Sequence, residues 1–127
     1  MKESKILDSS VWIAYLFDGK FEEQIESDEK LFLSALSLFE IKRKFIKKQI
    51  KEKDIESKID FIKKRSIVFP IDAKIAERAS ELSAEKNLPS MDALIYATSL
   101  VNKLKLITLD NDFRGLSDVE ILRIDED

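Results

Sequence analysis

Short apolar runs of the kind that form buried strands alternate with segments of helical periodicity along this chain. Parallel strands need long crossover connections, which are usually helical, so this alternation predicts an α/β fold with a mainly parallel sheet covered on both faces. No linker, repeat or low-complexity segment divides the sequence, which predicts one domain over residues 1–127. The expected strands are 5–9, 31–35, 67–71, 105–109 and 119–124. The expected helices are 10–17, 21–27, 37–51, one that Asp54 caps, 73–86 with Asp72 as its cap, and 91–102 with Ser90 as its cap.

The composition excludes several kinds of active site. The chain contains no histidine and no cysteine, so Ser-His-Asp triads, thiol nucleophiles and histidine-rich zinc sites are all ruled out. The lack of cysteine also fits a reducing compartment. The longest apolar run, 11–17, has seven residues, far short of the roughly 20 that cross a membrane. The first residues lead directly into strand-like sequence without a signal peptide. We therefore expect a cytoplasmic protein with no membrane partner.

Four acidic residues lie within apolar segments, where an ionised side chain is costly. Asp8 and Asp110 each follow an expected strand, whereas Glu40 and Asp92 each fall near the start of an expected helix. Strand ends and the helix starts that follow them lie at the same edge of a parallel sheet, which is where such folds place their sites. The four acids are therefore expected to converge, although long stretches of sequence separate them.

Converging carboxylates suit one class of ligand. Oxygen donors without imidazole or thiolate favour a hard cation such as Mg²⁺ or Mn²⁺. Asp112 could add a further carboxylate, and the hydroxyls of Ser9 and Thr108 could hold a water molecule or orient a carboxylate. Because like charges repel, some of these acids should have raised pKa values when no metal is bound.

Each acid also has a purely structural explanation. Glu40 could close a capping box with Ser37, three residues earlier. Asp92 could complement the dipole of its helix. Asp8 could cap the helix that follows it, although the next two serines could do so without burying a charge. The remaining two acids could belong to a turn before a short helix: Asp110 and Asp112. These explanations serve each acid singly, whereas only a common site explains why all four map to one edge.

The ordered motifs resemble those of PIN domains, specifically VapC-like toxin ribonucleases of toxin–antitoxin pairs. The resemblance covers essentially the whole chain and implies a three-layer α/β/α fold with a mainly parallel sheet. It further implies endonucleolytic, Mg²⁺- or Mn²⁺-dependent hydrolysis of RNA phosphodiesters. By motif position, Asp8, Glu40, Asp92 and Asp110 would be catalytic and would hold the metal, with Asp112 nearby. The motif segments are 7–11, Glu40 after 34–37, 92–98 and 108–113.

The same resemblance implies an RNA substrate, a homodimer, and a small antitoxin protein that covers the site. Two other functions remain open: a PIN nuclease that processes RNA without being a toxin, and a non-catalytic module that binds RNA or protein. Receiver domains and haloacid-dehalogenase-like phosphatases, which accept a phosphoryl group on an aspartate, also place acids at strand ends. The phosphatases need Asp-x-Asp after the first strand, and Asp8-Ser9-Ser10 lacks the second acid. The paired acids and the later phosphoacceptor aspartate of a receiver domain are not evident either.

A basic segment offers a candidate RNA contact. Lys44, Lys47, Lys48 and Lys51 follow the i, i+3, i+4, i+7 spacing of one helical face and could contact phosphates. The alternative is an ordinary solvated surface. Five aromatic side chains could line a groove for an antitoxin or, more commonly, belong to the core: Trp12, Tyr15, Phe17, Phe39 and Phe45.

Overall fold

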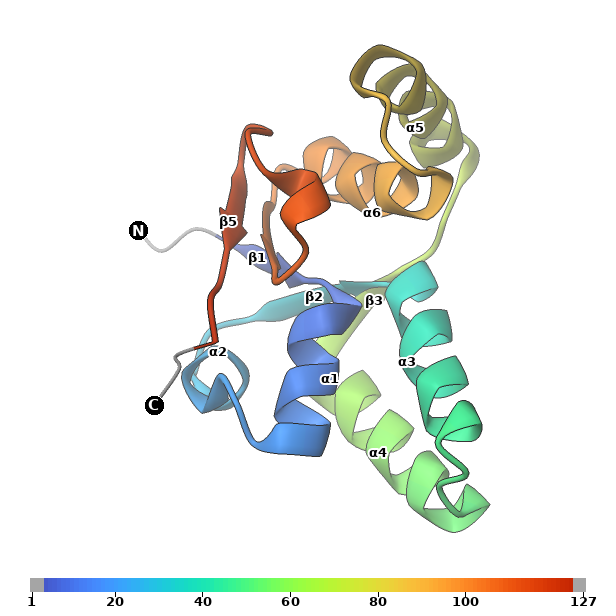
Figure 1. Ribbon diagram of the computed structural model, residues 1–127, viewed down its shortest axis with the longest axis vertical. Coiled ribbons are helices and arrows are strands. Elements are labelled where there is room, and N and C mark those ends of the chain that lie inside the picture. Colours follow the sequence, from blue (N-terminus) through green and yellow to red (C-terminus); the bar gives the residue numbers. More distant parts are fainter. Residues whose placement is uncertain (1–3, 125–127) are drawn as a thin grey trace.

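A five-stranded sheet, parallel throughout, forms the centre of the protein in the computed structural model, which describes residues 4–124 (Figure 1). The strand order is β3-β2-β1-β4-β5, so β1 occupies the middle and pairs with both β2 and β4. The expectation of a mainly parallel sheet is therefore confirmed. The strands are β1 (Lys5–Leu7), β2 (Leu31–Ser34), β3 (Ser66–Phe69), β4 (Lys105–Thr108) and β5 (Val119–Ile121).

Helices cover both faces of the sheet and complete the three-layer α/β/α fold. α5 and α6 lie on one face, whereas α1, α3 and α4 lie on the other (Figure 1). None of the helices in residues 4–124 has the length and apolarity needed to cross a bilayer. The helices are α1 (Ser9–Asp18), α2 (Glu22–Glu26), α3 (Ala35–Lys47), α4 (Glu52–Arg65), α5 (Ala73–Lys86), α6 (Ser90–Val101) and the 3₁₀ helix η1 (Asn111–Phe113).

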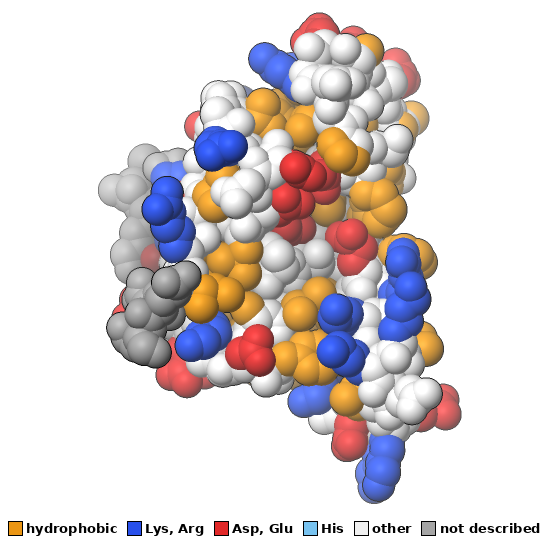
Figure 2. Space-filling model, in the orientation of Figure 1, with side chains coloured by type: hydrophobic (Ala, Val, Ile, Leu, Met, Phe, Trp, Pro, Cys, Tyr) orange, Lys and Arg blue, Asp and Glu red, His pale blue; other side chains and the backbone are white. Residues whose placement is uncertain are grey.

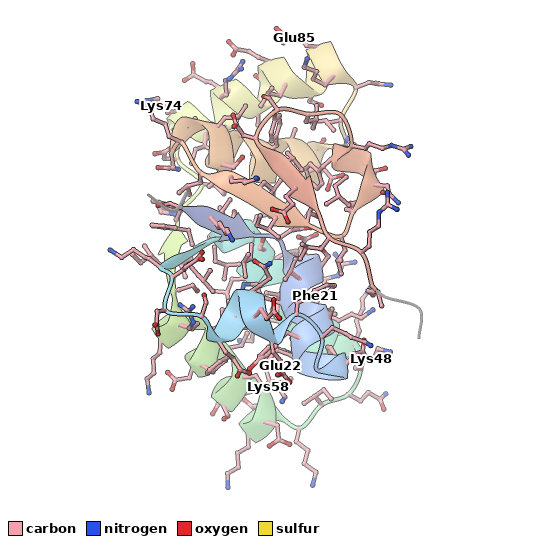
Figure 3. The ribbon with its side chains drawn as sticks, turned by 90° about the vertical axis from the view of Figure 1, so that its left-hand side faces the viewer. Phe21, Glu22, Lys48, Lys58, Lys74 and Glu85 are labelled. Atoms are coloured by element: carbon pink, nitrogen blue, oxygen red, sulfur yellow. The ribbon has the colours of Figure 1, made fainter. Side chains whose placement is uncertain are left out.

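Two apolar cores, one on each face of the sheet, follow from the alternation of side chains along the strands. Ile6 of β1 and Leu106 of β4 are fully buried in the core under α5 and α6. Their neighbours Leu7 and Ile107 point the other way and are fully buried against α1, α3 and α4. Figure 3 shows side chains of both helical layers directed toward the sheet between them. Buried on both faces, the strands require apolar residues in succession, as the sequence indicates.

The helix caps expected from the sequence are confirmed for α5 and are wrong for α3, α4 and α6. Asp72 caps α5 as expected, its carboxylate accepting a hydrogen bond from the amide of Ile75 at 2.9 Å. α3 begins earlier than expected, because Ser34 at the end of β2 caps it and accepts from the amide of Leu36 at 3.1 Å. α4 begins before Asp54, and α6 starts at Ser90 itself, without a side-chain cap.

Candidate active site

Asp8 is held rigidly at the junction of β1 and α1. It is 5% exposed and caps α1, with its Oδ1 accepting from the amide of Ser9 at 2.8 Å. Its Oδ2 accepts from the hydroxyl of Thr108 at 2.7 Å and from that of Ser10 at 2.9 Å. The structural explanation for Asp8, that it caps the following helix, is therefore confirmed, and neither Ser9 nor Ser10 is the cap residue. Three donors fix the orientation of Asp8 and compensate its burial.

The hydroxyls of Thr108 and Ser10 also tie α1 to the end of β4. Thr108 accepts from the amide of Asp110 at 3.0 Å, and Ser10 accepts from the amide of Leu109 at 3.0 Å. Thr108 therefore orients two of the acids at once. The sequence singles out Thr108 and Ser9 as supporting residues but not Ser10, although Ser10 directly follows Ser9 at the strand–helix junction and could have been recognised from that position.

Glu40 projects from the second turn of α3 toward this junction. Its Oε1 accepts from the hydroxyl of Ser9 at 3.1 Å. The capping-box explanation is wrong, because α3 begins with Ser34 as its cap and Ser37 lies inside the helix. The buried hydroxyl of Ser37 has no hydrogen-bond partner within residues 4–124. Burial raises the pKa of Glu40, with the Ser9 hydrogen bond opposing this effect and the charge of Asp8 adding to it.

Asp92, Asp110 and Asp112 form a tight group of carboxylates. One oxygen from each lies within 4.8 Å of the others. Asp92 lies in the first turn of α6, and Asp110 caps η1 by accepting from the amide of Asp112 at 2.9 Å. Asp110 therefore does cap the start of a short helix, and Asp92 has the first-turn position that its structural explanation requires.

The acids interact electrostatically across the whole site. Burial is the largest cause that raises the pKa of Asp92 to about 7, followed by the negative charges of Asp110 and Asp8. Smaller contributions come from Asp112 and Glu40. The expectation that clustering raises pKa values is thus met at Asp92 and Glu40. The charges of the other four acids therefore all act on Asp92, although only three acids make up the tight group.

The donor set fits a hard divalent cation. The chain supplies carboxylate and hydroxyl oxygens here and contains no histidine or cysteine. A divalent cation would offset the repulsion that raises the pKa of Asp92. β1 is the strand at which the chain connectivity changes direction, and Asp8 and Asp110 follow neighbouring strands there, as expected for ligand sites in parallel sheets. Figure 2 shows acidic side chains gathered over η1 and the start of α6, with basic side chains beside them over α3.

Comparison with protein families decides the classification. The family model described as PIN domain matches residues 5–119. The chain belongs to the PIN domain family. No curated protein sequence matches it.

Several solved structures share this PIN fold over nearly the whole chain. A toxin–antitoxin complex from Klebsiella pneumoniae is 27% identical with a TM-score of 0.75, covering 92% of this chain and 96% of the other. DNA-bound VapBC from Salmonella typhimurium is 15% identical with a TM-score of 0.76, covering 95% and 98%. VapC20 from Mycobacterium tuberculosis, a sarcin–ricin loop cleaving toxin, is 16% identical with a TM-score of 0.71, covering 90% and 95%.

The basic residues of this PIN domain do not form the single helical face predicted. Lys44 and Lys47 lie in the last turn of α3, but Lys48 is the C-cap residue and Lys51 precedes α4. The helix stops because the chain reverses at Gln49, which has a left-handed φ of 59°. Lys44 and Lys47 remain together on one face, and an RNA contact by any of the four stays a prediction.

The aromatic residues divide between core and surface. Trp12 and Phe45 are fully buried, whereas Phe39 is 54% exposed. Phe39 and the 57%-exposed Ile46 line an apolar groove of about 600 Å³ between α3 and α4. Its other lining residues are Ala35, Leu38, Lys42, Arg43, Lys47, Ile59 and Lys63. This PIN domain therefore has one large apolar surface feature on the same helix that carries Glu40.

Proposed function

We propose that this PIN domain is a divalent-metal-dependent endoribonuclease and the toxin of a toxin–antitoxin pair. The observation that carries the proposal is the convergence of Asp92, Asp110 and Asp112 within 4.8 Å, next to Asp8 and Glu40 at one sheet edge. Raised pKa values at Asp92 and Glu40, caused first by burial and then by neighbouring negative charges, support it, because a structural cap needs neither.

The residues divide into those that would bind metal and those that position them. Asp8, Glu40, Asp92 and Asp110 would hold Mg²⁺ or Mn²⁺, with Asp112 completing the ligand set. A bound divalent cation would supply a water of lowered pKa and stabilise the leaving oxygen. Thr108 and Ser10 hold Asp8 in one orientation, and Ser9 holds Glu40. No covalent intermediate is required, which suits a chain without a histidine-activated nucleophile.

Metal dependence is the first test. The purified protein should cleave RNA with Mg²⁺ or Mn²⁺, lose that activity in excess chelator, and regain it when the cation is restored. Full activity in chelator would refute the proposal. DNA of the same sequence serves as the control that separates a ribonuclease from a general nuclease.

Removal of single carboxylates is the second test. Asp8→Asn, Asp92→Asn and Asp110→Asn should each abolish most cleavage, and combining them should add little because they act as a unit. Asp28→Asn removes an exposed acid away from the site and is the matched control. Near-normal rates in all three site variants would favour the alternative of a non-catalytic binding module.

The toxin assignment rests on the similar complexes and on the apolar groove. An antitoxin that packs against Phe39 and Ile46 would cover apolar surface that is otherwise exposed to water. Expression of the chain alone should arrest growth of a bacterial host. Co-expression with an antitoxin encoded by a short reading frame next to the gene of this chain should restore growth. Asp92→Asn should be harmless in the same host. Active enzyme that leaves growth unaffected would instead indicate an RNA-processing PIN nuclease.

The oligomeric state is part of the same proposal. A homodimer is expected, and light scattering on the eluate of a sizing column measures it directly. A monomer at all concentrations would remove the dimer from the proposal without affecting the nuclease assignment.

A further inference from the structure

A small hollow of about 300 Å³ opens directly beside the carboxylate site, between α1 and α3. One part of its lining comes from the site itself, namely Glu40 and the Ser9 hydroxyl that is hydrogen-bonded to it. The rest is predominantly cationic: Arg43, Lys44 and Lys47, with Ile13 as its apolar wall. The charge of the lining therefore changes from negative to positive over one side of one helix.

The spacing along α3 produces this arrangement. Glu40, Arg43, Lys44 and Lys47 occur at i, i+3, i+4 and i+7, which places all four on one stripe of the helix. At a rise of about 1.5 Å per residue, the stripe reaches about 10 Å from Glu40 to Lys47. The cations thus begin one turn from a carboxylate of the site and continue away from the sheet.

The charge of Arg43 acts on Glu40, where it opposes the effect of burial on the pKa of that carboxyl, but the three cations are not paired among the described residues. Within residues 4–124, none of the three makes an ion pair or a side-chain hydrogen bond with another residue. All three side chains belong to exposed residues. Their charges are therefore available to an anion that enters the hollow.

We propose that this hollow binds a backbone phosphate of the substrate strand, next to the phosphodiester that is cleaved. The proposal rests on the nuclease function proposed above and adds the path of the substrate from the carboxylates along α3. Arg43 can donate a fork of two hydrogen bonds to phosphate, and the two lysines add point charges. The lining contains no aromatic side chain on which a base could stack. The subsite therefore reads the backbone and not the base.

A purely structural role for the cations makes a different prediction. Positive charges near a helix C-terminus stabilise the helix through its dipole, and Lys44 and Lys47 lie in the last turn of α3. Their removal would then lower stability and leave nucleic-acid affinity unchanged. Lys86 has the same charge and lies in the last turn of α5, on the other face of the sheet and outside the lining of the hollow. Lys86→Ala is therefore the matched control.

The deciding experiment measures binding without cleavage. Fluorescein-labelled short oligouridylate and oligoadenylate are titrated in chelator over a series of salt concentrations, with fluorescence anisotropy as the signal. Arg43→Ala should weaken binding about tenfold. Arg43→Ala, Lys44→Ala and Lys47→Ala should each reduce the salt slope by about 0.7, the value for one lost contact to a single strand. Both oligonucleotides should respond alike, and Lys86→Ala should match the wild type. Equal losses in Lys86→Ala and the hollow variants would overturn the proposal.

A second measurement separates a phosphate contact from an effect through Glu40. In the presence of Mn²⁺, Arg43→Ala should raise KM for RNA and leave kcat within about twofold, because uniform binding is lost. The Mn²⁺ concentration that shifts the melting temperature should stay unchanged. A loss of kcat together with weaker Mn²⁺ binding would overturn the subsite and assign Arg43 to the carboxylates. Wild-type protein that shows the expected salt slopes but cleaves nothing would overturn the proposed nuclease function alone.

Discussion

Asp8 and Asp92 are acids of one site with opposite surroundings. Asp8 accepts hydrogen bonds from an amide and two hydroxyls, whereas Asp92 is half-buried among other negative charges. In chelator, Asp8→Asn should lower the free energy of unfolding by roughly 1–2 kcal/mol, because an amide nitrogen in place of Oδ2 cannot accept the hydrogen bonds of Thr108 and Ser10. Asp92→Asn should raise it, because repulsion is removed.

Urea unfolding of both variants, with Asp28→Asn as the control for loss of an exposed acid, measures this difference. Shifts of the same sign in Asp8→Asn and Asp92→Asn would show that their surroundings do not distinguish them. The sequence alone indicates only repulsion among the acids, and repulsion alone would predict that Asp8→Asn and Asp92→Asn both raise the free energy of unfolding. The hydrogen bonds of Asp8 become visible only in the fold.

The raised pKa of Asp92 predicts a pH dependence. Its carboxyl group has a pKa of about 7 in the folded chain, compared with about 4 in an unfolded one. Between these values the folded state binds more protons, so its stability falls as pH rises and becomes level above about pH 7. In chelator, the wild type should therefore melt higher at pH 5 than at pH 8, and Asp92→Asn should reduce this difference. Melting temperatures over a pH series test it, and an equal pH dependence in both proteins would contradict it.

At the scale of elements, Arg65 fixes the segment between α2 and β2 to the end of α4. Its Nε donates to the carbonyl of Ile25 at 2.6 Å, and its Nη2 donates to the carbonyls of Ser27 at 2.8 Å and Glu29 at 2.9 Å. Arg65→Ala should lower the free energy of unfolding by about 2–3 kcal/mol, because these hydrogen bonds have a charged donor. Arg65→Lys should recover only part of the loss, since an ammonium cannot reach the same carbonyls as a planar fork.

Chemical denaturation measures this effect, and activity provides the control, because Arg65 lies outside the carboxylate site. Cleavage rates of the folded Arg65 variants should stay normal. A loss of activity without a loss of stability would contradict the structural role.

Helix starts show how far local sequence determines elements. Asp72 is the one capping residue at its helix start and was predicted correctly. Ser34 and Ser37 both precede apolar residues, and local sequence cannot choose between them because the choice depends on where β2 ends. The same early start of α3 removes the capping-box explanation for Glu40. The prediction that four lysines share one helical face was wrong for a related reason. The chain reverses at Gln49, and no local signal such as glycine marks this reversal in the sequence.

At the scale of the whole molecule, the alternation of strands and helices predicts the parallel sheet, and the rule for strand ends predicts the edge where the acids meet. Neither predicts the order β3-β2-β1-β4-β5, because pairing partners are chosen by packing between segments that are distant in sequence. The tight grouping of Asp92, Asp110 and Asp112 also depends on how η1 lies against α6.

Metal binding should be measurable as a gain in stability of the whole fold. The carboxylates converge only in the folded chain, so saturating Mn²⁺ should stabilise it by about 2.7 kcal/mol at a hundredfold excess over the dissociation constant. Melting with Mn²⁺ and with chelator tests this, and Asp92→Asn should show a smaller gain. An unmoved wild-type midpoint would indicate that the acids are helix caps without a metal site.

Because β1 is central, the carboxylate site lies at the junction between two halves of the chain, each of which supplies part of the acids. Residues before Pro70 build β1, β2 and β3 and carry Asp8 and Glu40. Residues after it build β4 and β5 and carry Asp92, Asp110 and Asp112. β1 and β4 join the halves through the pairing of Lys5 with Lys105, Ile6 with Leu106 and Leu7 with Ile107. A chain divided between β3 and α5 would leave an incomplete set of acids on each fragment, so recovered cleavage would directly report reassembly of the two fragments.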